Sequence, residues 1–483
     1  MPIEQGSTHK SRSADALPLH LRFAMLKAMN SSPLPRVLLI TYHYPPRPSV
    51  GSVRPAGLAK YLPEFGWEPI VLTPAFPGRD TSGTQIWETG YRDVIADWKR
   101  RFGLNPQAGL HAQLNLPLSA VPSSSKWYTK IMDFAWVCLT YPDENKGWTR
   151  FALEAISEFQ RSQRVQAIIS TGPPSSCHVI ASKAKNLLGC PWIADFRDLW
   201  VQNLAATNAG IALRMQDGLE KRTLRAADAL VTVSEPWAER LRERYPDKPN
   251  YAIANGFDPD DFASPPPPLT RTFSITYTGQ LYQGKRDPSP LLDVLQLLFR
   301  DGTLERGDVR VRFYGPVEPW LSAMVQRYGL QDVVEMPGKV SREEALLRQR
   351  ESQLLLQLGW SDARETGQYT GKLFEYLGSR RPILAVGGAR GVMTELLAKT
   401  GAGLHALSRA ELREFLVSSY AQYRSGGCVP FGASEADVKP YTHREMAHKM
   451  AGVLTTICGL KTVAAPPSGN PRGVAKSKEA VVL

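Results

Sequence analysis

Short, wholly apolar runs that alternate with helical stretches are the feature that most constrains this chain of 483 residues. Residues 37–40 read Val-Leu-Leu-Ile, and a loop and a helical segment separate them from the next run at 70–72. A strand with no polar residue on either side is typical of a parallel sheet that is covered on both faces. The alternation therefore predicts doubly wound α/β structure. Later runs of the same kind are 167–169, 192–194, 229–233 and 251–254.

A run of four prolines, at residues 265–268, interrupts this alternation, which then restarts. Consecutive prolines fit neither a helix nor a central strand and form a stiff, extended spacer. The chain is also too long for one ordinary core. We therefore expect two Rossmann-like, doubly wound parallel-sheet domains that face each other across a cleft, with ligands at the carboxyl ends of the strands. The expected parts are an N-terminal domain at 36–262, a linker at 263–270, a C-terminal domain at 271–430 and C-terminal helices at 431–458. The last helix, around residues 443–454, could pack against either domain.

The two ends of the chain are expected to lie outside the domains, as a flexible basic tail at 1–35 and a disordered tail at 459–483. The formal net charge is +12, and half of the excess lies in residues 1–36 and 459–483. Short tails with unclustered charges favour a solubilising role over binding to nucleic acid or anionic lipid. Because the chain also has no helix-turn-helix or aromatic–basic signature, nucleic acid is not an expected partner.

The cysteines and the hydropathy pattern predict the compartment. The five cysteines are scattered without metal-ligand spacing, which indicates a reducing environment and no metal site. The first thirty residues have no uninterrupted apolar core, and no run reaches the roughly 18 apolar residues of a spanning helix. We predict a cytoplasmic protein, located in solution or at the inner face of the cell membrane. Aromatic residues beside lysines at 127–148 either dock onto lipid as a peripheral contact or cover the N-terminal core.

Residues 367–378 are the most informative for chemistry. A glycine-containing loop follows the strand at 354–358 and opens a helix at Gly371. Glycines permit close approach, and the free N–H groups of a helix start suit a phosphate. Lys372 adds a positive charge, and Glu375, one turn further on the same face, can accept hydrogen bonds from a ribose diol. An ordinary Lys–Glu surface pair is the alternative. However, a cation in the first turn opposes the helix dipole, which favours a bound anion.

The segment 371–385, Gly-Lys-Leu-Phe-Glu-Tyr-Leu-Gly-Ser-Arg-Arg-Pro-Ile-Leu-Ala, resembles the donor-site segment of GT-B-fold glycosyltransferases of the group 1, family-4 retaining class. The resemblance extends over roughly 36–454 by the order of elements, and its other matching pieces are 191–198, 231–235, 254–258 and 277–286. It implies a nucleotide-sugar donor on the C-terminal domain and a glycan or lipid-linked acceptor on the N-terminal domain. It also implies retention at the anomeric carbon, no metal and no cofactor, since the nucleotide sugar is a co-substrate. Cell-surface polysaccharide assembly is the expected setting.

The resemblance also implies roles for single residues. Glu375 matches the carboxylate that binds the ribose, and Lys285, with Arg286, matches the cation that neutralises the diphosphate leaving group. Gly51, in the loop after the first strand, matches the glycine loop that closes on the phosphates and the reacting sugar. The expected donor site is completed by Gly279, Gly371 and Lys372.

The chain departs from the family pattern at three positions. Gly367 stands where the first of two glutamates is usual, Gln280 stands where an arginine is common, and Arg197 where many members have a histidine. The missing glutamate leaves the identity of the sugar open. A nucleotide-sugar epimerase of the same fold and a catalytically silent binding protein are therefore alternatives to a glycosyltransferase.

The expected catalytic residues are Asp198, Arg197 and Lys285, and the expected acceptor or sugar contacts are Asp195, Thr171 and Gly172. A carboxylate in the loop after residues 191–194 could bind the donor sugar or accept the proton of the acceptor. A local salt bridge between Arg197 and Asp198 that only orders the loop is the alternative. The turn after Gly172 is expected to face the cleft, and His178 in the helix that follows is expected to be a packed histidine.

Overall fold

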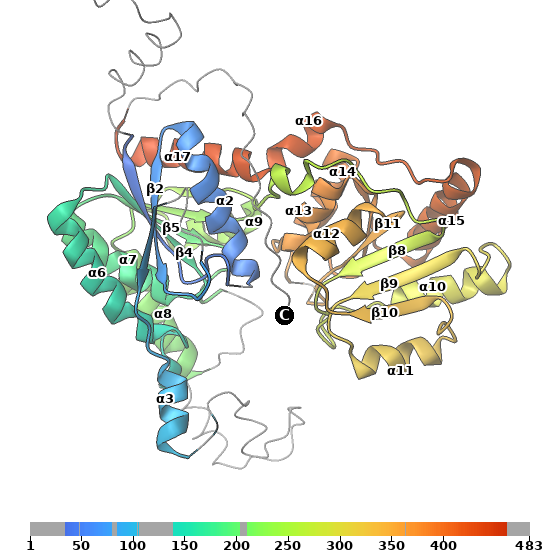
Figure 1. Cartoon of the computed structure of the whole chain (residues 1–483), viewed down its shortest axis with the longest axis horizontal. Coiled ribbons are helices and arrows are strands. Elements are labelled where there is room, and N and C mark those ends of the chain that lie inside the picture. Colours follow the sequence, from blue (N-terminus) through green and yellow to red (C-terminus); the bar gives the residue numbers. More distant parts are fainter. Residues whose placement is uncertain are drawn as a thin grey trace, which may run out of the picture.

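The computed structural model describes residues 34–47, 49–79, 85–103, 105, 139–202, 210–362 and 364–460. The two predicted tails, apart from residues 34, 35, 459 and 460, and the aromatic residues of 127–138 lie outside the described residues. The described chain forms two α/β units that stand side by side, each with a central parallel sheet (Figure 1).

The N-terminal unit is built on a seven-stranded sheet with the order β3-β2-β1-β4-β5-β6-β7. All neighbouring strands are parallel. The strands are β1 (Arg36–Ile40), β2 (Glu68–Pro74), β3 (Gln85–Thr89), β4 (Ala167–Gly172), β5 (Trp192–Phe196), β6 (Ala229–Thr232) and β7 (Asn250–Ala252). The helices are η1 (Val50–Ser52), α2 (Val53–Tyr61), η2 (Leu62–Phe65), α3 (Val94–Arg101), η3 (Lys146–Trp148), α6 (Thr149–Ser162), α7 (Ser176–Leu188), α8 (Ile211–Leu224) and α9 (Glu235–Arg244).

Strand β1 shows why its sequence is apolar throughout. Leu38 and Ile40 join the core that α6 and α7 cover, while Val37 and Leu39 join the core on the opposite face of the sheet. Successive side chains of a strand point to opposite faces, so a strand covered on both sides favours apolar residues at every position. The predicted two-sided burial is confirmed.

The C-terminal unit is built on a six-stranded parallel sheet with the order β10-β9-β8-β11-β12-β13. The strands are β8 (Phe273–Thr278), β9 (Val309–Tyr314), β10 (Val334–Gly338), β11 (Leu354–Leu358), β12 (Ile383–Val386) and β13 (Gly403–Ala406). The helices are η4 (Pro259–Phe262), α10 (Ser289–Arg300), α11 (Pro319–Arg327), α12 (Arg342–Arg350), α13 (Gly371–Ser379), α14 (Val392–Thr400), α15 (Arg409–Gly426), α16 (Glu435–Val438) and η5 (Lys439–Tyr441), and α17 (His443–Ile457) follows them in the chain. Helices α10, α11 and α15 pack into one core, and α13 and α14 pack into a second. The predicted pair of doubly wound sheets is confirmed.

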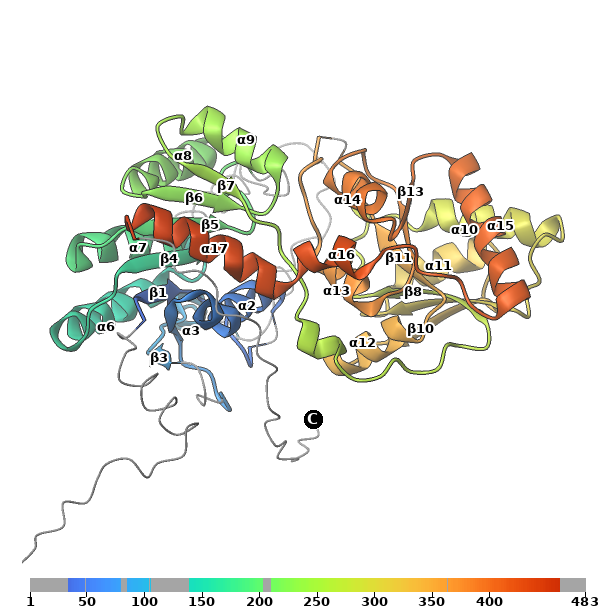
Figure 2. The same cartoon turned by 90° about the horizontal axis from the view of Figure 1, so that it is seen from above.

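The last helix, α17, returns to the N-terminal unit (Figure 2). Its apolar side chains, including Met446, Met450 and Leu454, share a core with α2 and with one face of the N-terminal sheet. The structure thereby decides between the two packing partners that the sequence allows.

The two connections between the units run side by side. The Phe257 N–H donates to the Tyr441 carbonyl at 3.0 Å, and the His443 N–H donates to the Phe257 carbonyl at 2.8 Å. Gly256 permits this contact, because a Cβ atom at this position would lie 2.6 Å from the Tyr441 oxygen. The domains are thus joined by two chain segments that are hydrogen-bonded to each other, rather than by one linker.

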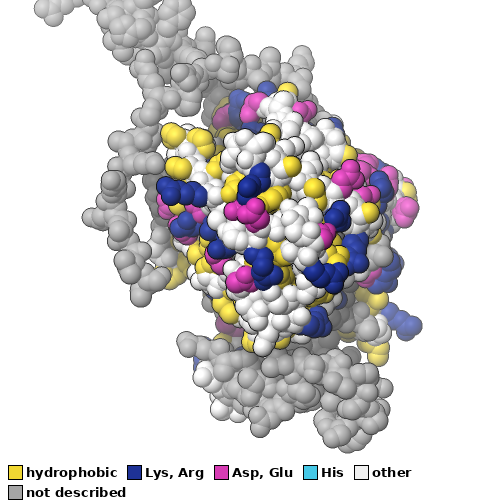
Figure 3. Space-filling view, turned by 90° about the vertical axis from the view of Figure 1, so that its right-hand side faces the viewer, with side chains coloured by type: hydrophobic (Ala, Val, Ile, Leu, Met, Phe, Trp, Pro, Cys, Tyr) yellow, Lys and Arg dark blue, Asp and Glu magenta, His cyan; other side chains and the backbone are white. Residues whose placement is uncertain are grey.

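Basic and acidic side chains are interspersed on the face of the molecule that Figure 3 shows. Several of the arginines of the C-terminal unit form ion pairs, such as Arg306 with Asp332 and Arg409 with Asp293. The positive charge is therefore not gathered into one patch on this face.

Candidate active site

The start of helix α13 lies at the carboxyl end of the C-terminal sheet. Strand β11 leads into a loop, defined here as the donor loop (residues 359–362 and 364–370), which ends at the N-cap residue Thr370. The Thr370 side chain does not cap the helix and instead donates to Gln357 Oε1 at 3.1 Å. The first N–H groups of α13 are therefore left without a side-chain acceptor from the N-cap, as anion binding requires.

Two cations, Lys372 and Arg286, lie at this helix start, and a third, Lys285, has its Nζ 5.6 Å from the centroid of the Trp360 ring in the donor loop. Lys372 Nζ donates to the Tyr277 hydroxyl at 3.0 Å and lies 4.6 Å from the centroid of the ring. Arg286 Nη1 approaches the same hydroxyl at 3.4 Å. Among the residues that the structure describes, none forms an ion pair with Lys285, Arg286 or Lys372. Burial, together with the nearby Arg286 charge, lowers the pKa of Lys372 to about 7. Cations held in this way attract an anion.

Gly279 provides the space for this lysine. Its φ angle is +107°, and a Cβ atom here would lie 2.4 Å from Lys372 Cε. Only glycine tolerates both the backbone conformation and the contact. Gly279 therefore acts on the site through the position of Lys372.

Glu375 lies on the same helix but does not pair with Lys372. Its side chain is 23% exposed, and Oε1 lies 3.5 Å from Arg342 Nη2, which in turn lies 2.8 Å from Asp261 Oδ2. Burial raises the pKa of Glu375. The two charges of α13 thus point to different partners, and the alternative of an ordinary surface Lys–Glu pair is not the arrangement observed.

The glycine loop of the N-terminal unit reaches the same place. A Cβ atom at Gly51 would lie 2.3 Å from Arg197 Nη1, and one at Gly371 would lie 3.4 Å from Val50 Cγ1. Gly51 and its neighbour Val50 therefore lie between Arg197 and the start of α13. The structure brings together residues that the sequence separates by more than 300 positions.

Arg197 and Asp198 follow β5 at the carboxyl edge of the N-terminal sheet. The Arg197 N–H donates to the Gly172 carbonyl at 2.9 Å, and its guanidinium donates to the Pro173 carbonyl. Burial raises the pKa of Asp198. Within the described part of the chain the two side chains form no ion pair with each other, so the alternative of a local salt bridge is not observed.

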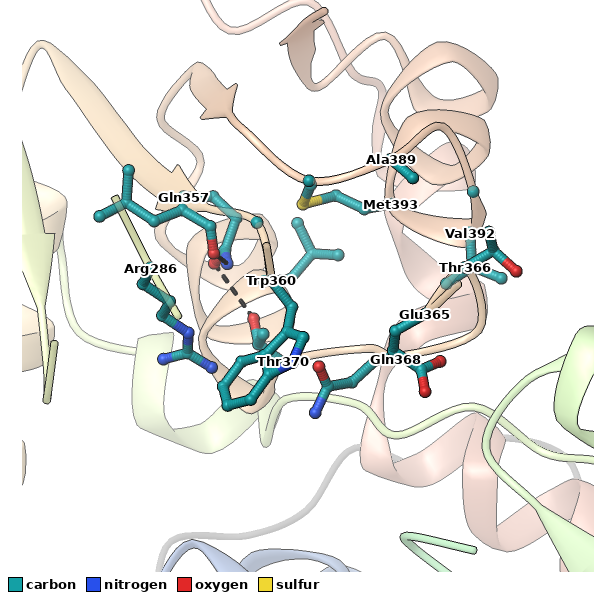
Figure 4. Close-up of a pocket in the computed structure, with 15 residues that line it drawn as sticks. Arg286, Gln357, Trp360, Glu365, Thr366, Gln368, Thr370, Ala389, Val392 and Met393 are labelled. Carbon is teal, nitrogen blue, oxygen red and sulfur yellow. Dashed lines mark hydrogen bonds between the residues drawn. The ribbon is translucent and has the colours of Figure 1, made fainter. Parts of the chain in front are cut away.

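A pocket lies beside the start of α13 (Figure 4). Arg286, Trp360 and Thr370 line it from one side and Met393 from another. The rest of its wall consists of Gln357, Leu358, Gly359, Glu365, Thr366, Gln368, Leu373, Gly388, Ala389, Gly391 and Val392. Apart from Arg286, the sequence analysis does not name these residues as site residues, because they come from segments around β11, β12, α13 and α14 whose proximity only the parallel sheet creates. The glycines that follow β12 are the one local signal of a close approach.

The N-terminal unit matches a known family. Residues 51–256 fit the family described as glycosyl transferase 4-like domain, and the two sheets form the two-domain GT-B arrangement. The chain thus has the fold of the GT-B glycosyltransferases. The group 1, family-4 type fits this assignment and agrees with the resemblance seen in the sequence.

Solved structures with the same fold cover most of this chain. Anabaena Alr3699/HepE in complex with UDP and glucose matches with a TM-score of 0.56 at 12% identity, over 87% of this chain and 100% of that chain. Sucrose-phosphate synthase from Thermosynechococcus elongatus matches with a TM-score of 0.55 at 14% identity, over 88% of this chain and 99% of that chain. A glycosyltransferase from Rickettsia africae ESF-5 matches with a TM-score of 0.53 at 13% identity, over 88% of this chain and 99% of that chain. No curated protein sequence matches the chain.

The structure corrects the prediction for Asp195. This carboxylate is fully buried, and both of its oxygens accept hydrogen bonds from Arg54, at 2.8 to 3.1 Å. The Arg54 side chain is itself only 2% exposed. Because Asp195 has no exposed surface, it does not contact a sugar or an acceptor, and it instead fixes α2 to the sheet.

Thr171 and Gly172 are also fully buried, contrary to direct contact with an acceptor. A Cβ atom at Gly172 would lie 2.5 Å from His178 Nε2, and the Gly172 carbonyl accepts the Arg197 N–H. Gly172 therefore positions Arg197. His178 is a packed histidine, as expected: its Nδ1 lies 2.8 Å from Ser170 Oγ, and burial lowers its pKa to about 3.

The described residues contain neither a metal-binding cluster nor a membrane-spanning helix. No group of three or more His, Cys, Asp or Glu side chains among them could hold a metal ion. None of the described helices has the length and apolar character needed to cross a membrane.

Proposed function

We propose that this chain transfers a sugar from a nucleotide-sugar donor to a glycan or lipid-linked acceptor in the assembly of a cell-surface polysaccharide. One observation carries the proposal: Arg286 and Lys372 lie at the uncapped start of α13 without an ion-pair partner in the described chain, with Lys285 against Trp360 of the adjoining donor loop. A diphosphate supplies the missing negative charge. The complexes of Anabaena Alr3699/HepE with UDP and with UDP-glucose make uridine diphosphate sugars the first donors to test.

Each part of the site has a task in the proposed reaction. The N–H groups of α13 and Lys372 bind the diphosphate, while Glu375 accepts hydrogen bonds from the ribose hydroxyls. The acceptor oxygen bonds to the anomeric carbon as the bond from that carbon to the phosphate oxygen breaks. The electron pair leaves with the nucleoside diphosphate, and Lys285 and Arg286 stabilise this charge without a metal ion. Retention at the anomeric carbon is part of the proposal.

Asp198 is proposed to face the acceptor side of the reaction. Burial raises its pKa and thereby makes the carboxylate a stronger base. It either hydrogen-bonds the donor sugar or takes the acceptor proton. Arg197 lies against Gly51 and completes the positive charge around the phosphates.

The test is a panel of UDP, GDP and dTDP sugars, with binding measured by saturation-transfer NMR and products by mass spectrometry. A new glycosidic bond supports the proposal. A changed sugar configuration without a new glycosidic bond would instead indicate a nucleotide-sugar epimerase. Binding without turnover in the presence of a broad set of acceptors would indicate a catalytically silent binding protein.

Lys285→Ala tests the leaving-group role in particular. We expect turnover to fall by roughly 10² to 10³ with little change in nucleotide affinity, since the charge develops in the transition state. Lys399→Ala, at an exposed lysine of α14, is the matched control. Equal rates for Lys285→Ala and the wild type would remove Lys285 from the mechanism.

A further inference from the structure

The donor loop is attached to the N-terminal domain as well as forming a wall of the pocket. At Gly367 it presses against α9: a Cβ atom there would lie 2.4 Å from Trp237 Cδ1 and 3.1 Å from Ser234 Oγ. Any side chain at position 367 would push the two domains apart. The contact with α9 therefore accounts for the absence of a glutamate at this position.

Glu365, two residues earlier, makes the polar part of this attachment. Its Oε1 accepts from Trp237 Nε1 at 2.9 Å and from the Gly367 N–H at 3.1 Å, and its Oε2 lies 3.8 Å from Arg240 Nη1. Arg240 also donates to the Arg364 carbonyl at 3.1 Å. The contacts made by Trp237 and Arg240 join the donor loop of the C-terminal domain to α9, whereas the hydrogen bond from the Gly367 N–H lies within the loop.

The Glu365 side chain is only 6% exposed. A carboxylate taken out of water is stable only where donors and a cation replace the water. Two of the groups that replace it, the Trp237 indole and the Arg240 guanidinium, belong to the other domain. The observed place of Glu365 therefore requires that α9 stands against the donor loop.

We propose that Glu365 is a positioning residue that couples closure of the two domains to the shape of the donor pocket. When the domains separate, Glu365 loses Trp237 and Arg240 and returns to water, and the wall that holds Trp360 and Gln368 loses its support. When they close, the wall is fixed beside the bound sugar. This inference rests on the proposed function, because it takes the pocket to hold the sugar of the donor.

The variants Glu365→Ala and Trp237→Phe remove the two ends of the main hydrogen bond. We expect either one to lower kcat/KM for the nucleotide sugar by about 10-fold or more, because a charged hydrogen bond is lost. The affinity for UDP should stay within about twofold, since Lys372 and Glu375 are not touched by these changes. A loss of general stability would instead weaken UDP binding as well. The double variant should be little worse than either single variant, since both break one contact.

Glu365→Gln keeps an oxygen that accepts from Trp237 and loses only the charge towards Arg240, so it should restore most of the activity. Glu414→Ala, at an exposed glutamate of α15, is the control. Wild-type kcat/KM in Glu365→Ala, or an equal loss of affinity for UDP and for the nucleotide sugar, would overturn the proposal.

Small-angle X-ray scattering with UDP bound tests the coupling without any turnover. Glu365→Ala and Trp237→Phe should have a larger radius of gyration than the wild type and Glu414→Ala. Identical scattering curves would refute the attachment, whereas absence of transfer by an enzyme that closes normally would refute the proposed function alone.

Discussion

Lys372 is a cation in a place where charge is unfavourable until a ligand arrives. Burial and Arg286 lower its pKa to about 7, so it is largely protonated below that pH and largely neutral above it. A bound diphosphate stabilises the protonated form, and binding above pH 7 must therefore take up a proton. We expect UDP affinity, measured by calorimetry, to fall as pH rises from 7 to 9, by at most roughly tenfold per unit.

Lys372→Arg provides the comparison, because a guanidinium keeps its charge throughout this range. The arginine variant should bind UDP with a flatter pH profile, whatever its absolute affinity. Titration of UDP itself affects both proteins equally. The same slope above pH 7 in both would show that Lys372 is not the titrating group.

Glu375 is the second residue of α13 with a specific task. Replacement by alanine should weaken UDP binding by about 1–3 kcal/mol through the loss of charged hydrogen bonds to the ribose. The loss should be much smaller for 2′,3′-dideoxy-UDP, which lacks the hydroxyls concerned. If calorimetry shows the same UDP affinity in variant and wild type, Glu375 does not contact the nucleotide.

At the scale of elements, the turn after β8 decides where Lys372 lies. Gly279→Ala introduces strain at a positive φ angle and a clash with Lys372, so we expect a loss of about 1–3 kcal/mol in unfolding free energy and weaker UDP binding. Gly284→Ala is a matched control, since Gly284 also has a positive φ of 71° but no atom within 4 Å of its Cβ position. It should lose stability in urea unfolding while UDP affinity stays unchanged.

The strands could largely be predicted from the sequence, whereas some contacts between them and other elements could not. The apolar runs at 37–40 and 192–194 predicted buried parallel strands, and β1 and β5 are such strands. Asp195 within β5 is predicted to contact the acceptor or the sugar, because a carboxylate after residues 191–194 could bind the donor sugar or accept the acceptor's proton. Its partner Arg54 lies 141 positions away, and no local sequence pattern predicts that pairing.

At the scale of the whole molecule, the two domains are joined where the chain segments at 256–257 and 441–443 pass side by side. Gly256→Ala would place a methyl group 2.6 Å from backbone atoms of residues 441 and 442, which cannot move aside as a flexible side chain can. We expect a loss of about 1–3 kcal/mol in unfolding free energy and a broader domain arrangement in small-angle scattering. Gly452→Ala, in α17 with no atom near its Cβ position, should be neutral or stabilising by up to about 1 kcal/mol. Equal stability of both variants would contradict the role of these two segments.

The sequence by itself determined the two parallel-sheet domains and the local pattern at the start of α13 on which the proposed phosphate site rests. Both depend on local properties: apolar runs without alternation, glycines that open a helix, and a lysine and a glutamate one turn apart. Only the tertiary structure decided that Asp195 pairs with Arg54, that α17 belongs to the N-terminal core and that Glu365 meets Trp237 and Arg240. These are contacts between segments far apart in the chain. Whether a charged side chain is free for a substrate depends on which distant partner and how much water reach it, and both are properties of the folded molecule alone.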